Sequence, residues 1–371
     1  MTKIFCDQRS INARAILAEL DADFVDDPAQ ADLIWLRGGH SHLRSYLYPQ
    51  QLLNYIPGEG TLGEKGHLAQ HLKAFDRTQQ LFDFSLRDFY PQTYTLYDEA
   101  ECRAFFAQLP ATDVEENLWI LKPVDLSKGI GVRIMWQFDA LRQLYEPRDD
   151  DEIFPEIQEY VIQRYIKNPL LLHERKSEIR IYLLIACLDP LLVLLYREGT
   201  VRLNSQPFRL GDFENTLIHV TNVYQQKRHP DYDPELVLKW DFDDLQSYLV
   251  NELKRADENF IEEQLRPQLR NILKFVLQAV LQRLQKPNAS GLGFGLYGVD
   301  LILDESLRPW LTEVQLGPGL SFDDPVKERI IPNMVREAAR IVLEIQQRKR
   351  RRDALTRLEN VSTFEWLIND A

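Results

Sequence analysis

A chain of 371 residues is longer than most single domains, so the sequence predicts two or three lobes around a cleft. With 44% hydrophobic and 27% charged residues, the composition is that of an ordinary globular protein and excludes extensive disorder. The formal net charge of −13 argues against general nucleic-acid binding, which needs a basic surface. It still permits a local basic groove for a small anion or an acidic peptide.

The cysteines and the most apolar segment indicate the compartment. Cys6, Cys102 and Cys187 are widely scattered and have neither metal-site spacing nor a disulfide framework, which favours a reducing environment. The N-terminus lacks the apolar core of a signal peptide. Residues 181–196 are too short to span a bilayer and contain Asp189-Pro190 near their centre. We therefore expect a cytoplasmic protein without a membrane segment.

Hydrophobic periodicity predicts helices and strands along the whole chain. Strands are expected at 3–7, 31–36, 118–122 and 132–136, and helical regions at 11–20, 62–84, 245–285 and 324–352. From about residue 160 strands dominate, and 179–203 has the pattern of a meander. Pro267 is expected to break the third helical region because proline cannot donate a helical hydrogen bond.

The pattern divides the chain into four expected parts. These are an N-terminal α/β lobe at 1–60, a central lobe at 61–158, a C-terminal lobe at 159–345 and a basic helix end with a tail at 346–371. The run Arg348–Arg352 is typical of a solvated helix end, where positive charge is favourable, with a partner-binding patch as the alternative. Phe364 and Trp366 in the tail are expected to pack back on the fold.

A glycine-containing loop joins the strands at 118–122 and 132–136. Lys122 precedes it, and Lys128, Gly129 and Gly131 lie within it. Small residues let backbone N–H groups approach phosphate oxygens, and lysines supply compact positive charge. The loop is neither a Walker A sequence nor a dinucleotide fingerprint. A flexible hairpin without a ligand is the alternative interpretation.

Charged residues alternate along the first strand of the expected meander. Lys176, Glu178 and Arg180 project from one face, and Arg202 lies on a later strand. Such a row is either a surface ion-pair ladder of little energetic value or a cleft wall that binds ribose, phosphate and carboxylate groups.

Two further segments carry weaker signals. Residues 161–166 read as a strand with polar insertions, which would suit the wall of an adenine slot or a plain edge strand. His219 and Thr221 are predicted to share a strand face, where a structural histidine is as good an explanation as a binding one.

Near the C-terminus, two apolar strand-like runs each carry one carboxylate, Asp300 and Glu313. If the turn between them centres near Ser306, these carboxylates lie opposite one another, and Gln315 shares the face of Glu313. Like charges opposite one another repel, and a divalent cation such as Mg²⁺ carrying nucleotide phosphates would remove that cost. Two solvated strand carboxylates are the alternative.

The order of these motifs resembles the ATP-grasp fold, an α/β (α+β) architecture with largely antiparallel sheets that enclose a nucleotide. Within that fold the chain looks like the tubulin–tyrosine ligase-like family over roughly residues 30 to 345. The specific phrases are QRYIKNPLLLHERKSEIRIYLL, DPLLVLLYREGTVRLNSQPF, HVTN and YGVDLILDESLRPWLTEVQLGPGL.

The resemblance implies roles for individual residues. In the nucleotide site, Lys122 and Lys128 would hold the phosphates under a loop containing Gly129 and Gly131, Gln163 and Tyr165 would flank adenine, and Lys176 and Glu178 would hold adenine and ribose. Around the reacting groups, Arg180 would face the γ-phosphate. Arg202 and Thr221 would bind the carboxylate of the amino acid, in a pocket shaped by His219 and Asn222. The Mg²⁺ ligands would be Asp300, Glu313 and Gln315. Lys128, Arg180 and Arg202 are the expected catalytic set. The chain departs from the family pattern at Glu178, where aspartate is usual, and at Gln315, where asparagine is usual.

The resemblance implies an ATP-dependent carboxylate–amine ligase that works through an acyl phosphate. It would join Tyr, Glu or Gly to a protein or peptide acceptor, for which an acidic tubulin tail is one candidate. Two alternatives stay open: a catalytically silent relative that binds nucleotide or peptide, suggested by Gln315, and an ATP-grasp ligase that acts on a small peptide. Nucleic-acid and membrane partners are not expected.

Overall fold

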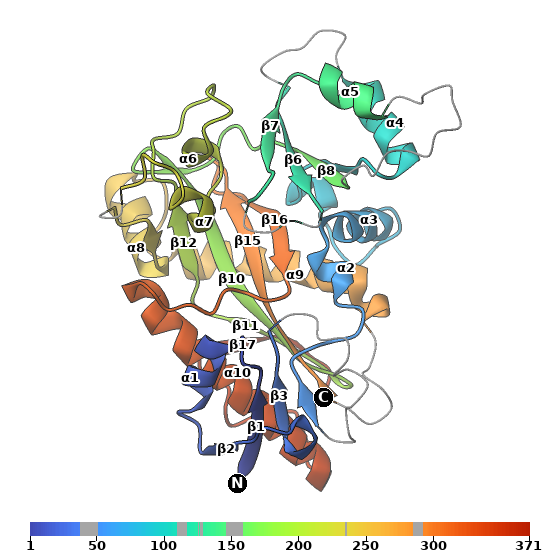
Figure 1. The fold of residues 1–371 in the computed structure, drawn as a ribbon, viewed down its shortest axis with the longest axis vertical. Coiled ribbons are helices and arrows are strands. Elements are labelled where there is room, and N and C mark those ends of the chain that lie inside the picture. Colours follow the sequence, from blue (N-terminus) through green and yellow to red (C-terminus); the bar gives the residue numbers. More distant parts are fainter. Residues whose placement is uncertain are drawn as a thin grey trace.

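The computed structural model in Figure 1 describes residues 1–37, 51–109, 117–124, 126, 129–145, 159–233, 236–284 and 292–371. Within these ranges the strands form three sheets, which have five, four and eight strands. Lys128 and residue 158, where the central lobe is expected to end, lie outside the described residues. No helix of the described part is both long and apolar enough to cross a bilayer.

The first sheet is parallel and has the strand order β14-β4-β3-β1-β2. Its strands are β1 (Thr2–Cys6), β2 (Ala22–Phe24), β3 (Leu33–Trp35), β4 (Leu52–Leu53) and β14 (Leu292–Gly293), and helix α1 (Ile11–Leu17) connects β1 to β2. The expected strands at 3–7 and 31–36 and the helix at 11–20 are confirmed. β14 was not expected, because two residues are too few to give a period.

The second sheet is antiparallel, with the order β5-β8-β6-β7. Its strands are β5 (Thr93–Thr95), β6 (Trp119–Pro123), β7 (Arg133–Met135) and β8 (Tyr160–Arg164), and the helices of this region are α2 (Gly60–Gly63), α3 (Lys65–Asp76), α4 (Glu99–Gln108) and α5 (Asp139–Tyr145). Phe105 of α4 packs edge-on against Trp119 of β6 in the core of this lobe.

The helical region predicted at 62–84 is too long, because α3 ends at Asp76. Beyond it, the side chain of Gln79 accepts hydrogen bonds from the backbone N–H groups of Leu81 and Phe82. Phe82 and Phe84 then pack against Phe275. Burial of these aromatic rings takes precedence over continuation of the helix.

The third sheet has the order β13-β12-β10-β11-β17, and β15 lies on the other edge of β10 and pairs with β16. The strands are β9 (Leu171–Leu172), β10 (Arg175–Leu188), β11 (Leu191–Tyr196), β12 (Thr200–Leu203), β13 (Lys239–Trp240), β15 (Gly295–Leu303), β16 (Pro309–Gln315) and β17 (Phe364–Asn369). β17 pairs with β11 and buries Phe364, so the tail packs back on the fold as expected.

The meander predicted at 179–203 is wrong. In a meander β12 would pair with β11, but β12 pairs instead with the first half of β10, and β11 pairs with the second half. β10 is 14 residues long, so one strand can hold both partners end to end on the same edge. Between β11 and β12, Gly199 lies so close to the carbonyl oxygen of Arg180 that a Cβ on this residue would be 2.8 Å from that oxygen.

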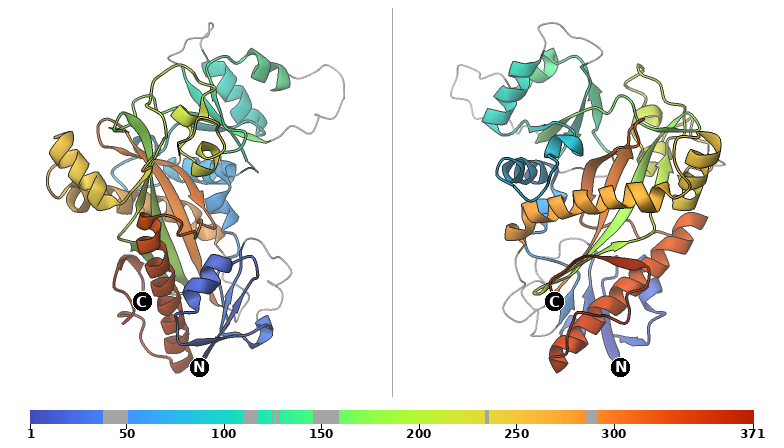
Figure 2. Two further views of the ribbon diagram at one scale, coloured as in Figure 1. Left: turned by 60° about the vertical axis from the view of Figure 1, so that its left-hand side comes forward. Right: turned by 180° about the vertical axis from the view of Figure 1, so that it is seen from behind.

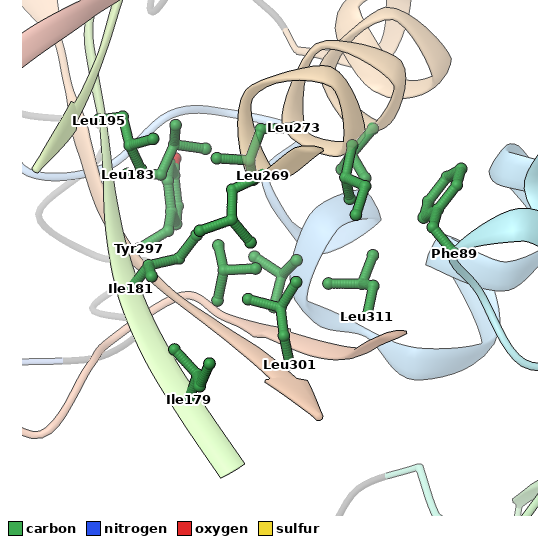
Figure 3. Close-up of a cluster of buried hydrophobic side chains, with 14 of the residues drawn as sticks. Phe89, Ile179, Ile181, Leu183, Leu195, Leu269, Leu273, Tyr297, Leu301 and Leu311 are labelled. Carbon is green, nitrogen blue, oxygen red and sulfur yellow. The ribbon is translucent and has the colours of Figure 1, made fainter. Parts of the chain in front are cut away.

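Helices cover both faces of the third sheet (Figure 2). The helices of this part are α6 (Thr216–His219), α7 (Val223–Gln226), α8 (Phe242–Ser247), α9 (Arg266–Val280) and α10 (Pro325–Arg351), of which α9 and α10 pack on opposite faces of the sheet. Figure 3 shows Ile179, Ile181 and Leu183 of β10 directed toward Leu269 and Leu273 of α9. The alternate residues Tyr182 and Leu184 join the cluster that contains α10.

The break in the helical region 245–285 lies near Lys254, not at Pro267 as predicted. Lys254 has a positive φ of 52°, a conformation that cannot continue a right-handed helix. Pro267 instead lies in the first turn of α9, where its missing N–H costs little.

Candidate active site

The alternating row on β10 is buried. Lys176 is 3% and Arg180 is 7% exposed, and Glu178 lies between them on the same face of the strand. Of the two residues between them, Ile179 enters the apolar cluster with α9, and Ser177 is also buried. The row is therefore an internal wall, and a surface ion-pair ladder does not describe it.

Asp300 is the centre of a network of buried charges. β10 and β15 pair so that Arg180 lies opposite Asp300, and Arg180 donates hydrogen bonds to both of its carboxylate oxygens, with Nη2 2.7 Å from Oδ2. From β12, Arg202 Nη2 lies 2.8 Å from Asp300 Oδ1 and 2.8 Å from Glu178 Oε2. Two arginines thus share two carboxylates.

The network sets the protonation of its members. Burial opposes ionisation of Asp300, but Arg180 and Arg202 outweigh burial and hold its pKa below the usual range. Burial likewise disfavours the charge on Arg180, yet Asp300 raises the pKa of this guanidinium. For Glu178, burial raises the pKa and Arg202 opposes that shift.

The hairpin of β15 and β16 brings the predicted acidic groups together. Asp300 pairs with Glu313 and Gly298 with Gln315, which confirms the expected register and turn. Gln315 Nε2 lies 2.5 Å from Glu313 Oε1 and 3.4 Å from Asp300 Oδ2. The three side chains expected to hold a metal therefore converge on one spot.

The donor set fits a hard divalent cation, which prefers carboxylate and amide oxygens. An N–H group of Gln315 now bridges the two carboxylates, so the space between them attracts positive charge. Within the described ranges no group of three or more His, Cys, Asp or Glu side chains is placed to bind a metal. A cation held here would thus depend on the Gln315 oxygen and on oxygens of a ligand.

A narrow crevice separates this hairpin from the central lobe. It is lined by Lys65 and Lys122 from one side and by Thr312 and Glu313 from the other, and Gln163 lies at its wall. Lys122 Nζ donates to the neutral amide oxygen of Gln163 at 2.7 Å. Burial lowers the pKa of Lys122, and Glu313 opposes that shift. Because the Lys122 ammonium group bonds to a neutral amide and not to a carboxylate, it is well suited to bind an incoming anion.

Lys176, Tyr165 and His219 form a second buried cluster. Lys176 Nζ donates to the backbone carbonyl of His219 at 2.9 Å and lies 3.4 Å from the Tyr165 hydroxyl, which is 2.8 Å from His219 Nδ1. Burial lowers the pKa of Lys176 to about 8 and lowers that of His219 as well. The structure thus brings together three residues expected at the nucleotide and amino-acid sites.

The expectation that His219 and Thr221 share a strand face is wrong. His219 ends the short helix α6, which begins because the side chain of Asn215 accepts a hydrogen bond from the N–H of Leu217. Thr221 is buried beyond the end of that helix, and Asn222 accepts a hydrogen bond from the N–H of Tyr224.

Gly129 and Gly131 of the expected phosphate loop have φ values of 71° and 72°, so both need glycine. A Cβ on Gly129 would lie 3.3 Å from Cβ of Asn222, which places the loop against the segment that contains His219. The glycines and the expected amino-acid site are therefore neighbours.

Three polar residues of this region were not predicted from the sequence. Thr93 Oγ1 accepts a hydrogen bond from Gln163 Nε2, and Thr312 Oγ1 lies 3.1 Å from Glu178 Oε1. Asn204 follows Arg202 by two residues and is fully buried, yet neither polar atom of its side chain bonds to a described residue. Residues two apart on a strand share a face, so the spacing from Arg202 could have indicated that Asn204 faces the site.

Two mainly antiparallel sheets that face each other across a crevice, with basic groups opposite paired carboxylates, define an ATP-grasp protein. The sequence model of the tubulin-tyrosine ligase family matches residues 42–351. The chain belongs to this family.

Several curated proteins are similar to the chain. The probable tubulin polyglutamylase TTLL2 of Homo sapiens is 30% identical over 286 residues, which are 74% of this chain and 43% of that protein. The probable tubulin polyglutamylase TTLL9 of Bos taurus is 28% identical over 325 residues, which are 78% of this chain and 67% of that protein. The protein polyglycylase TTLL10 of Rattus norvegicus is 28% identical over 350 residues, which are 88% of this chain and 50% of that protein. The chain spans between 43% and 67% of the length of these relatives.

Proposed function

We propose that the chain is an ATP-dependent ligase that joins an amino acid to a carboxylate of a protein or peptide acceptor. The observation that carries this proposal is the meeting of Arg180 and Arg202 with Asp300 and Glu313 beside the crevice that also contains Lys122. A site with paired carboxylates and buried cations can neutralise a transferring phosphoryl group. The names of the relatives favour glutamate or glycine as the added amino acid and tubulin as the acceptor, while tyrosine rests on the family name alone.

We assign to individual residues the roles that the family resemblance implies. For the nucleotide, we assign the phosphates to Lys122, Lys128, Gly129 and Gly131, and the adenosine to Gln163, Tyr165, Lys176 and Glu178. For the reacting groups, we assign the γ-phosphate to Arg180, the amino acid to Arg202, His219, Thr221 and Asn222, and Mg²⁺ to Asp300, Glu313 and Gln315. The expected domain boundaries and the cytoplasmic location stay predictions.

The proposed reaction needs an electrophile made from a carboxylate, which is unreactive. Transfer of the γ-phosphoryl group to the acceptor carboxylate gives an acyl phosphate; the neutral amine of the amino acid then attacks its carbonyl, phosphate leaves, and the nitrogen loses a proton. When bound, Mg²⁺ would supply charge neutralisation to the phosphates. Arg180 and Arg202 present fixed guanidinium groups on neighbouring strands, so they can orient anions without reorganisation during the reaction.

Replacement of Glu313 tests this proposal. Glu313→Gln removes one anionic group from the proposed metal site, so we expect ADP release with Mg²⁺ and ATP to fall at least about 100-fold. Glu305→Gln is a matched control, because Glu305 is exposed in the turn of the same hairpin. Mass spectrometry of acceptor peptides incubated with ATP and mixed amino acids would identify the added residue. Unchanged turnover in Glu313→Gln would contradict the assignment.

A second candidate function is nucleotide or peptide binding without catalysis. The bridge from Gln315 to both carboxylates favours it, because a bridging N–H occupies the oxygens that a metal needs. Nucleotide binding without ADP release in the wild-type chain would support this alternative. A product on small peptides but not on tubulin tails would support a small-peptide ligase.

A further inference from the structure

A cavity of about 640 Å³ lies at the carboxyl end of the first sheet. One wall is formed by residues 9–13 at the start of α1, and the floor by 35–37 and 53–55, which follow β3 and β4. The opposite wall is residues 316–321, which follow β16 directly. A volume of this size is typical of sites for small ligands or short peptide segments.

The topology of the sheet explains why a cavity forms here. From β1, the chain passes through α1 to β2 on one side, whereas β3 and β4 lie on the other side of β1. The connections therefore leave the sheet in opposite directions between β1 and β3. Ligands of open parallel sheets bind in the crevice at such a switch point, outside the carboxyl ends of the strands.

The cavity adjoins the crevice of the candidate active site. Glu64 lines the cavity and Lys65 lines the crevice. In the same way, Leu316 lines the cavity while Val314 lines the crevice, and Gln315 lies between them. A ligand that fills the cavity would thus have one end beside Glu313 and Gln315.

Two arginines lie at the edge of the cavity. Arg9 and Arg37 are exposed, and each donates a hydrogen bond to the backbone carbonyl of the other, at 3.4 Å and 3.2 Å. Arg9 also lies 3.5 Å from Asp7, but its side chain is 60% exposed, so this contact leaves it accessible. The reciprocal bonds tie each guanidinium group to the backbone of the other residue, and guanidinium groups are well suited to bind carboxylates.

The acidic residues of the cavity already have partners. Glu59 accepts hydrogen bonds from the Tyr297 hydroxyl at 2.9 Å and from the N–H of Ile56 at 3.1 Å. Glu64 pairs with His67 on the adjoining helix. Opposite the arginines, no atom of the described residues lies within 4 Å of where a Cβ on Gly317 or Gly319 would be, so the loop backbone leaves space for a ligand.

We propose that this cavity binds the acidic segment of the acceptor, with its carboxylates on Arg9 and Arg37 and its reacting end directed to the crevice. The inference rests on the proposed ligase function and adds a location and residues to it. Both arginines precede residue 42, where the match to the family model begins.

Binding of a defined peptide tests the proposal. The probe is a fluorescent hexaglutamate peptide, with hexaglutamine as its uncharged counterpart, measured by anisotropy with the full chain at low salt. We expect Arg9→Glu/Arg37→Glu to weaken hexaglutamate binding at least about 10-fold, since both cationic contacts become repulsive. The double variant Arg103→Glu/Arg357→Glu changes the net charge equally at exposed positions outside the cavity, and should bind within about 2-fold of wild type.

A second variant tests the cavity without altering charge. Gly319→Phe would place a ring in the open space of the cavity, and we expect it to weaken hexaglutamate binding while ATP affinity and the thermal unfolding midpoint stay unchanged. Equal binding by the Arg9/Arg37 variant and its control, or no binding by the wild-type chain, would overturn the proposal. Peptide binding at these arginines without ADP release or product would support the proposed site and count against the ligase function instead.

Discussion

At the scale of single residues, the main feature is a set of charges removed from solvent. Glu178, Arg180, Arg202 and Asp300 form one network in which each charge has an opposite partner. Such networks gain little stability over apolar packing, because desolvation costs nearly cancel the attraction. The network is therefore better explained by a role in binding ligands than by stability.

Lys176 gives a prediction for pH dependence. Its pKa is lowered by burial from 10.5 to about 8, so between these values the unfolded chain holds more protons than the folded one. The contribution of Lys176 to the free energy of unfolding is lowest below pH 8 and rises as the pH increases toward 10.5. Relative to Lys176→Met, the wild-type free energy of unfolding should rise by up to about 1.4 kcal/mol per pH unit in this window.

Urea denaturation of both proteins at pH 7.5, 8.5 and 9.5 measures this difference. Lys3→Met is the control, because Lys3 is exposed on β1. A wild-type minus Lys176→Met difference that does not change with pH would contradict the predicted titration.

At the scale of elements, an irregularity in the β15–β16 hairpin adds a side chain to the site. The register shifts between Asp300 and Leu301, so Thr312 and Glu313 together face Asp300. Thr312 consequently reaches Glu178 while Glu313 reaches Gln315. A regular hairpin would present one of these two residues and not both.

Thr312→Val tests the value of that contact. The substitution keeps the β-branched shape but removes the hydroxyl, so Glu178 loses a hydrogen bond in a half-buried position. We expect a loss of about 1 kcal/mol in the free energy of unfolding and a several-fold weaker affinity for ATP. Thr312→Ser should restore both, since it keeps the hydroxyl. Failure of serine to restore ATP affinity would show that packing, and not this bond, is what matters.

Local patterns predicted most of the site but not its irregular parts. Alternation on β10 was enough to group Lys176 with Arg180, and the two-residue period of the hairpin was enough to group Asp300 with Glu313, because regular strands fix which residues share a face. The meeting of these two groups depends on the pairing of β10 with β15. The helix that ends at His219 depends on a cap from Asn215, which competes with the strand propensity of the same segment. Pairing of β12 with β10 depends on tertiary contacts that no periodicity records.

At the scale of the whole molecule, the first sheet is completed by distant parts of the chain. β14 supplies its edge strand, and α10 covers it through a cluster in which Ile16 and Leu17 of α1 lie with Met334 and Val342. Gln346 of α10 also donates to the carbonyl of Asp32, which precedes β3. The N-terminal lobe is thus continuous in space with the C-terminal lobe.

We predict that a fragment of residues 1–60 does not fold by itself. Without β14 and α10, the apolar face of α1 keeps only the strands of its own lobe, and a small sheet cannot bury enough surface to offset its conformational entropy. Circular dichroism of the fragment should show no cooperative thermal transition, whereas the full chain should show one. A cooperative transition in the fragment would establish an autonomous lobe.

The contacts of Asp300 with two guanidinium groups have a thermodynamic consequence. An anion that approaches Arg180 or Arg202 competes with a resident carboxylate, and a cation that approaches Asp300 competes with resident arginines. When both arrive, each releases the partner that the other requires, so their affinities are linked and must increase one another by the same factor. Titration of ATP at several Mg²⁺ concentrations, and of Mg²⁺ at several ATP concentrations, should therefore return one common coupling energy.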